Sequence, residues 1–163
     1  MVFTEKVDSK ILSPESLLKR INFWRGMKDK IVFTNGCFDI LHFGHIQLLA
    51  NCNEFGERLI VGLNSDNSVK QLKGNDRPLN TQQNRAALLA ATQFVDAVVI
   101  FDEETPEHLI QLIKPDVLVK GGDWAKADIV GAGFVESYGG EVRTVPYVEG
   151  FSTTGILAKS KGR

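Results

Sequence analysis

Two histidines, His42 and His45, stand where an apolar run that ends at Gly36 gives way to a helical pattern. The run 30–36 predicts a buried strand, and the segment 45–56 predicts a helix with one apolar side. Backbone N–H groups at the start of a helix are unpaired and partly positive, so they attract phosphate. Two imidazoles at that junction can donate further hydrogen bonds to phosphate oxygens. The spacing therefore indicates a site that binds phosphate and stabilises negative charge on it.

The same pair of histidines has two other interpretations. Each ring could be an ordinary surface or core residue, or the two could hold a metal ion. Cys37 and Cys52 lie fifteen residues apart without a C-x-x-C pair, and no further ligand stands at a familiar zinc spacing. We therefore expect no metal held by protein ligands and a packing role for the Cys37 side chain. His108 lies mid-helix in a charged stretch, and we assign it no function.

Strand and helix patterns alternate along the chain, and the strands are continuous apolar runs, as in sheets covered on both faces. The sequence predicts an α/β fold: one Rossmann-like, doubly wound domain over 1–163 with a five-stranded parallel sheet, in which 1–28 is an N-terminal extension and helix and 29–163 is the core. In such sheets the ligand lies outside the carboxyl ends of the strands. The expected strands are 30–36, 58–64, 96–101, 116–122 and 141–147. The first expected helix begins at Pro14, the next ones cover 45–56, 81–93, 106–113 and 128–138, and the last one is capped by Ser152. A loop is expected at 68–80.

Composition places the chain among ordinary globular proteins. It has 163 residues, of which 43% are hydrophobic, and a formal net charge of −1. That charge argues against a protein that binds nucleic acid mainly by electrostatic attraction. No apolar stretch is long enough for a membrane span, and the N-terminus lacks a secretory pattern. We expect a reduced, cytoplasmic protein with neither nucleic acid nor membrane as a partner.

Three stretches of the sequence carry a family resemblance. GCFDILHFGH (36–45) resembles the G-x-F-D-x-x-H-x-G-H signature of the HxGH nucleotidyltransferase superfamily. FSTTGI (151–156) is similar to that superfamily's second signature, an S-T-T at the start of the last helix. VKGGDW (119–124) and its surroundings narrow the resemblance to the adenylyltransferases of ADP-heptose synthesis, over about 10–160. Because some of these enzymes are fused to a sugar kinase and none is visible here, we expect a stand-alone form.

The resemblance implies a reaction between ATP and D-glycero-β-D-manno-heptose 1-phosphate that yields ADP-heptose and pyrophosphate, with Mg²⁺ accompanying the ATP. It implies that His42 and His45 stabilise the α-phosphate and the leaving oxygen. It places a basic residue near the outer phosphates, for which we expect Lys73, with Lys70 and Arg77 as alternatives. A homodimer is compatible with this family.

The remaining site residues implied by the resemblance fall into two groups. Lys120, Asp39 and Arg77 are expected on the substrate side, where Asp39 would position the loop or assist Mg²⁺. The nucleotide is expected to contact Asn35, Gly36, Cys37, Phe38, Gly44, Arg85, Gly122, Asp123, Trp124, Ser152, Thr153 and Thr154.

Three other functions agree less well with the sequence. A cytidylyltransferase acting on glycerol 3-phosphate or another polyol phosphate is disfavoured, because Val148 stands where those relatives carry an arginine. A non-catalytic nucleotide-binding domain is disfavoured because His42, His45 and the Ser-Thr-Thr run are all intact. An NAD-binding domain is excluded because no G-x-G-x-x-G follows the first strand.

Overall fold

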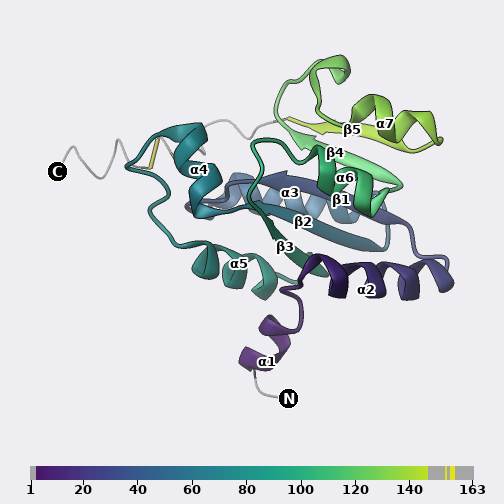
Figure 1. Cartoon of the computed structure of the whole chain (residues 1–163), viewed down its shortest axis with the longest axis horizontal. Helices are drawn as coiled ribbons and strands as arrows, with labels where there is room; N and C mark the ends of the chain where they lie inside the picture. Colours follow the sequence, from purple (N-terminus) through teal and green to yellow (C-terminus); the bar gives the residue numbers. More distant parts are fainter. Residues whose placement is uncertain (1–2, 147–152, 154, 157–163) are drawn as a thin grey trace.

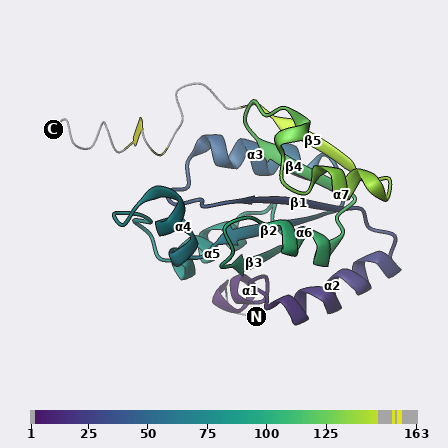
Figure 2. The ribbon, with the colours of Figure 1, turned by 45° about the horizontal axis from the view of Figure 1, so that its top comes forward.

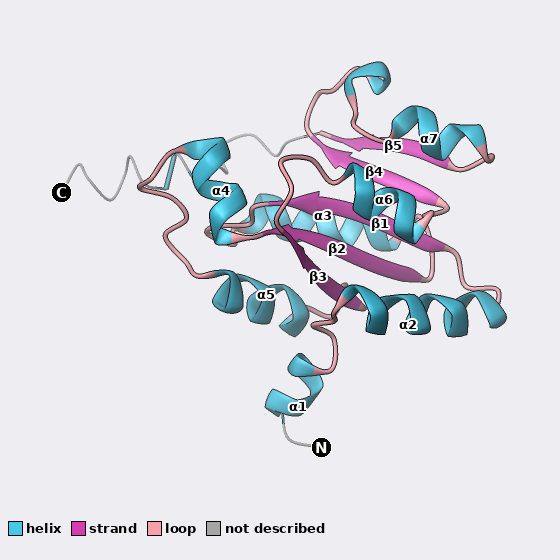
Figure 3. Cartoon of the chain, in the orientation of Figure 1, coloured by secondary structure: helices cyan, strands magenta, loops and turns pink. Residues whose placement is uncertain are grey.

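A computed structural model describes residues 3–146, 153 and 155–156 of the chain. Five strands form one sheet in the order β3-β2-β1-β4-β5, and every neighbouring pair is parallel (Figure 1). The predicted α/β architecture with a five-stranded parallel sheet is therefore confirmed (Figure 3). The strands are β1 (Ile31–Gly36), β2 (Arg58–Asn64), β3 (Ala97–Phe101), β4 (Val117–Gly121) and β5 (Glu141–Val145), each within two residues of its predicted bounds.

Helices cover both faces of this sheet, and the strand side chains contribute to two separate hydrophobic cores. Phe33 belongs to one core and its neighbour Val32 to the other, because successive side chains of a strand point to opposite faces. Figure 2 shows α3 and α6 on opposite sides of the sheet. One face packs against α2 (Pro14–Gly26), α6 (Glu107–Ile113) and α7 (Ala132–Ser137), and the other against α1 (Phe3–Asp8), α3 (Phe43–Asn53) and α5 (Gln82–Ala91).

The direction of the chain reverses between β1 and β4. From β1 the chain moves outward through β2 and β3, and it then returns to add β4 and β5 on the other side. The loops that leave β1 at Gly36 and β4 at Gly121 therefore diverge, and ligands of doubly wound sheets bind at such a point. The histidine segment follows β1 directly, so the fold carries it to this edge.

The prediction of a loop over 68–80 was wrong for its first part. Residues Asp66–Lys73 form a helix, α4, which follows β2 directly. The Ser65 hydroxyl accepts a hydrogen bond from the Ser68 N–H at 3.0 Å and so caps the helix, while Val69 is fully buried beneath it. The other side chains of α4 are mostly polar, so the segment lacks the apolar periodicity from which a helix is predicted.

The continuous helix predicted over 128–138 was also wrong. A short 3₁₀ turn, η1 (Lys126–Asp128), is separated from α7 by Gly131, whose φ of 84° lies in the left-handed region. A Cβ at this glycine would lie 2.7 Å from the Ile110 side chain, so the loop approaches α6 closely. Asp128 is therefore the last residue of a short turn after β4 and does not begin a long helix.

Smaller differences concern helix ends. α3 begins at Phe43 rather than at residue 45 and ends at Asn53, short of Gly56. A Cβ at Gly56 would lie 2.7 Å from the Lys30 carbonyl oxygen, so this glycine allows a close backbone approach instead of capping a helix. α1 had no sequence prediction. The last predicted helix lies largely outside the described residues, although residue 153 and residues 155–156 are helical. Among the described helices, none is long and apolar enough to cross a membrane.

Candidate active site

A cavity of about 260 Å³ lies at the carboxyl ends of β1 and β4. It therefore occupies the reversal point of the sheet, where the topology predicts a ligand. Most of the residues predicted for nucleotide and substrate come together in its wall. The lining residues are Asn35, Gly36, Cys37, Phe38, Asp39, His45, Leu48, Lys73, Lys120, Gly121, Trp124 and Thr153.

The start of α3 holds the two histidines against each other. His42 is the N-cap residue, with an extended backbone, and its carbonyl oxygen accepts from the His45 N–H at 2.9 Å. The imidazole rings stack with centroids 3.8 Å apart and planes inclined by 23°. The Nδ1 atoms of both rings are buried without a hydrogen bond of normal geometry. The pair is thus held by a backbone hydrogen bond and by ring stacking; His45 lines the cavity, whereas His42 is not among the lining residues.

Both histidines are held in the neutral form at pH 7. Burial lowers the pKa of His42. Burial, reinforced by the neighbouring His42, lowers the pKa of His45 to about 4, against an opposing contribution from the Ile40 backbone. A neutral imidazole has one N–H donor, so each ring can donate one hydrogen bond to a phosphate oxygen without giving up a proton.

The turn between β1 and α3 depends on close packing at Gly36. A Cβ on this glycine would lie 3.0 Å from the Phe38 ring. Phe38 itself adopts a left-handed backbone with φ of 44°, and its buried ring lies 5.0 Å from the His45 ring. The Phe38 ring therefore packs against the His45 ring, and the residues of this turn line the cavity.

Two lysines from different elements reach the same cavity. Lys73 is the last residue of α4 and lines the cavity, whereas Lys70, one turn earlier, does not. Lys120 lies on β4 with its Nζ 5.6 Å from the centroid of the Trp124 ring, and burial lowers its pKa. The indole N–H donates to the Gly121 carbonyl at 3.1 Å, which fixes the ring beside the lysine.

Asp39, the acid of the histidine motif, is engaged in holding a loop. It is 2% exposed, and its carboxylate lies 2.6 Å from the Arg77 guanidinium. It also accepts hydrogen bonds from the Leu79 and Asn80 N–H groups at 2.8 and 3.1 Å. Burial alone would raise the pKa of Asp39, but these hydrogen bonds outweigh it and lower the pKa. Of the two roles expected for Asp39, the geometry agrees with positioning of the loop, and Arg77, expected near the phosphates, pairs with this buried carboxylate.

Arg85 does not line the cavity, although it was predicted to contact the nucleotide. Its side chain is fully buried in α5, and its guanidinium donates to the carbonyl oxygens of Cys37, Asn64 and Asn80 at 2.6, 2.8 and 3.0 Å. A further bond of 2.7 Å joins it to the Asp66 carboxylate. Through these hydrogen bonds Arg85 links the segments that follow β1 and β2. Direct contact between Arg85 and a phosphate does not agree with this geometry.

The remaining predicted residues are placed as follows. Gly44 lies in the first turn of α3. Gly122 has a φ of 109°, and its N–H donates to the Val145 carbonyl at 2.8 Å, which joins the ends of β4 and β5. Asp123 is exposed and is not among the residues that line the cavity. Ser152 and Thr154 lie outside the described residues.

A family model described as cytidylyltransferase-like matches residues 33–154, which include the strand–histidine–helix segment and nearly all of the sheet. The chain belongs to the cytidylyltransferase-like family.

This cytidylyltransferase-like chain is similar to longer proteins. It is 55% identical over 151 residues to the bifunctional protein HldE of Koribacter versatilis, an alignment that covers 93% of this chain and 31% of that protein. It is 58% identical over 134 residues to the bifunctional protein HldE of Campylobacter concisus, covering 82% of this chain and 28% of that protein. The chain thus spans about a third of the length of these relatives.

Solved structures share the fold of this cytidylyltransferase-like chain. The lipopolysaccharide core biosynthesis protein of Thermoplasma volcanium superposes with a TM-score of 0.64 at 25% identity, over 74% of this chain and 99% of that one. Pantoate-beta-alanine ligase of Francisella tularensis superposes with a TM-score of 0.59 at 15% identity, over 93% of this chain and 76% of that one. The second likeness concerns the fold alone.

Two lining residues, Leu48 and Gly121, had no role in the sequence prediction. Leu48 of α3 borders the cavity, and its side chain would lie 3.2 Å from a Cβ at Gly121. The glycine at the end of β4 therefore lets that strand approach α3. The available signal was only the helical spacing of Leu48, which is equally typical of a core residue.

The low pKa of His45 predicts a pH dependence of stability in this cytidylyltransferase-like chain. A histidine in the unfolded chain has a pKa of about 6.5. Between about pH 6.5 and 4 the unfolded state therefore binds more protons than the folded state, and the free energy of unfolding decreases as the pH is lowered. The contribution of His45 is fully present above pH 6.5. We expect a loss of about 1–2 kcal/mol by pH 4.5, allowing for partial exposure of the ring.

Urea unfolding at pH 7.0 and 4.5 checks this expectation in the wild type and in His45→Gln. The loss on acidification should be smaller in the variant, since glutamine does not titrate. His108→Gln, which alters an exposed histidine on α6, is the matched control and should lose as much stability as the wild type. An equal loss in all three proteins would contradict the assignment to His45.

Proposed function

We propose that this chain is a sugar-phosphate adenylyltransferase that transfers AMP from ATP to D-glycero-β-D-manno-heptose 1-phosphate. The observation that carries the proposal is His45 at the start of α3, which lines the cavity together with Lys73 and Lys120 and is stacked on His42. A neutral imidazole, a second one stacked on it, a helix N-terminus and two cations lie at or beside one space. Such a set is suited to a bound polyanion.

The proposed chemistry requires alignment rather than proton abstraction. A phosphate oxygen of the acceptor, already anionic at neutral pH, attacks the α-phosphorus of ATP. The new P–O bond forms as the bond to the bridging oxygen breaks, and pyrophosphate leaves. His42 and His45 would donate to the α-phosphate and bridging oxygens, where charge grows. Lys73 would hold the outer phosphates, and Lys120 the acceptor phosphate. The protein thus neutralises the charge of two polyanions held close together.

Magnesium enters this proposal as part of the nucleotide substrate. Among the described residues, no group of three or more His, Cys, Asp or Glu side chains could hold a metal ion. The Asp39 carboxylate is occupied by Arg77, Leu79 and Asn80. Mg²⁺ would therefore be held by phosphate oxygens and water, and it would offset the charge of the triphosphate.

The choice of nucleotide and acceptor rests on the chain's resemblance to the heptose adenylyltransferases. Identity of 50–58% to proteins named HldE and a structural likeness to a lipopolysaccharide core biosynthesis protein support it. The test measures pyrophosphate release from ATP or CTP, each with the heptose 1-phosphate or glycerol 3-phosphate and with Mg²⁺. Release with ATP and the heptose phosphate alone is expected. Release only with CTP would replace the substrate assignment by a cytidylyltransferase, and no release would contradict catalysis of these reactions.

Lys73 and Lys70 offer a matched pair of variants on α4. Lys73 lines the cavity and makes no ion pair within the described residues, whereas Lys70 stands outside the cavity wall. We expect Lys73→Ala to lower kcat/KM for ATP about tenfold or more, because a charged contact to phosphate is lost. Lys70→Ala should change it less than twofold. The reverse order in steady-state kinetics would transfer the phosphate role to Lys70.

A further inference from the structure

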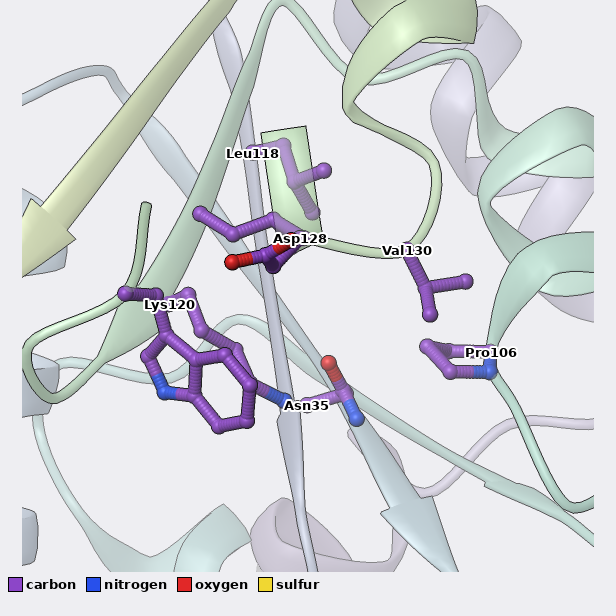
Figure 4. Close-up of a pocket in the computed structure, with 8 residues that line it drawn as sticks. Asn35, Pro106, Leu118, Lys120, Asp128 and Val130 are labelled. Atoms are coloured by element: carbon purple, nitrogen blue, oxygen red, sulfur yellow. The ribbon is translucent and has the colours of Figure 1, made fainter. Parts of the chain in front are cut away.

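A second, smaller cavity of about 80 Å³ adjoins the first one. Figure 4 shows the side chains that line it. The two cavities share Asn35, Lys120 and Trp124, so these side chains form a common wall. The shared wall means that one molecule could extend from one cavity into the other. The other lining residues of the second cavity are Pro106, Leu118, Asp128, Ile129 and Val130.

The polar side chains of the second cavity are unequal in charge, and Asp128 among them is exposed to solvent. The carboxylate of Asp128 makes no hydrogen bond or ion pair with the residues that the structure describes, and the same holds for the Asn35 side-chain amide. Figure 4 shows Asp128 on one side of the cavity and Lys120 with Asn35 on another. One end of the space is therefore anionic, and the wall it shares with the first cavity is cationic.

This charge arrangement orients an acceptor that carries one phosphate. Lys120 attracts the phosphate to the shared wall, which is also the side of His45 and Lys73. Asp128 repels it from the far end. A carboxylate is a strong acceptor for hydroxyl donors, and the apolar side chains of Pro106 and Leu118 suit the C–H faces of a sugar ring.

We propose that the second cavity binds the hydroxyl-bearing end of the sugar phosphate, and that Asp128 determines specificity by accepting hydrogen bonds from its hydroxyl groups. This inference rests on the proposed function and adds the location of the acceptor. The competing occupant is the nucleotide base, whose exocyclic amine could also donate to a carboxylate. A base in this cavity would link Asp128 to ATP rather than to the sugar.

Steady-state kinetics of Asp128→Asn separates the two occupants. Asparagine keeps the size of the side chain and removes the charge. We expect KM for the heptose 1-phosphate to rise about tenfold, with KM for ATP within twofold of wild type. Glu136→Gln, which changes an exposed acid on α7, is the matched control and should alter neither constant. A rise in KM for ATP, or no change in KM for the acceptor, would overturn the proposal.

A binding measurement keeps this inference separate from the reaction. Calorimetric titration of the heptose 1-phosphate into the protein saturated with a non-hydrolysable ATP analogue needs no turnover. Binding to the wild type that weakens about tenfold in Asp128→Asn supports the acceptor site, even if pyrophosphate release is absent and the proposed activity fails. Equal binding to both proteins, or no binding to the wild type, would overturn the inference.

Discussion

Replacement of His42 or His45 by alanine should lower kcat by about 10²–10³-fold while the Kd for ATP changes less than about threefold. Both imidazoles are neutral and stacked, and their Nδ1 atoms are buried, so the rings are positioned before a substrate arrives. Donors of this kind stabilise the transition state more than the ground state, because negative charge on the transferred phosphate grows as pyrophosphate departs. The loss should therefore appear in turnover and not in nucleotide affinity.

Single-turnover kinetics with a parallel ATP titration measures the two quantities separately. His45→Gln retains an N–H donor and should recover part of the activity lost in His45→Ala. His108→Ala, on the exposed face of α6, should behave as wild type. Because the His42 and His45 rings touch, the double variant should lose less than the product of the two single effects. Unchanged turnover in both single variants would remove the histidines from the mechanism.

The parts of the fold that sequence predicted are those whose signal is local. Each strand is an apolar run bounded by polar or turn residues, and the reported bounds differ from the predicted ones by at most two residues. The starts of α2 at Pro14 and α5 at Gln82 lie within one residue of the predicted starts, and the Ser13 and Thr81 hydroxyls cap them, because a hydroxyl three residues before a free N–H is a short-range feature. α4 was missed because its only fully buried apolar residue is Val69, too little to produce a periodic pattern.

The candidate site divides in the same way. The histidines and the turn at Gly36 belong to one segment, and the fold of a doubly wound sheet brings that segment to the end of β4. The roles of Asp39 and Arg85 depend on partners far along the chain, Arg77 and the carbonyl of Cys37. A motif supplies the residue type at such a position, but whether the side chain faces a ligand or the interior is decided by packing.

Arg85→Ala is expected to lower the free energy of unfolding by about 3–5 kcal/mol. The guanidinium is completely buried and donates to three carbonyl oxygens and one carboxylate. Alanine would leave those acceptors buried without donors, together with a cavity in α5. Urea denaturation measures the change. Arg143→Ala removes an exposed ion pair with Glu141 and should cost less than about 1 kcal/mol.

A second substitution at this position, Arg85→Lys, tests whether Arg85 positions the active site or only stabilises the fold. Its bond to the Cys37 carbonyl fixes the turn between Gly36 and the histidines, and its bond to Asp66 fixes the first turn of the helix that ends at Lys73. We expect Arg85→Lys, assayed at a temperature where it remains fully folded, to raise KM for ATP and lower kcat together, since one ammonium cannot replace a guanidinium with several donors. Wild-type kinetics in the folded variant would show that Arg85 contributes to stability alone. A loss of activity that Asp66→Asn partly reproduces would show that Arg85 aligns both phosphate-binding elements.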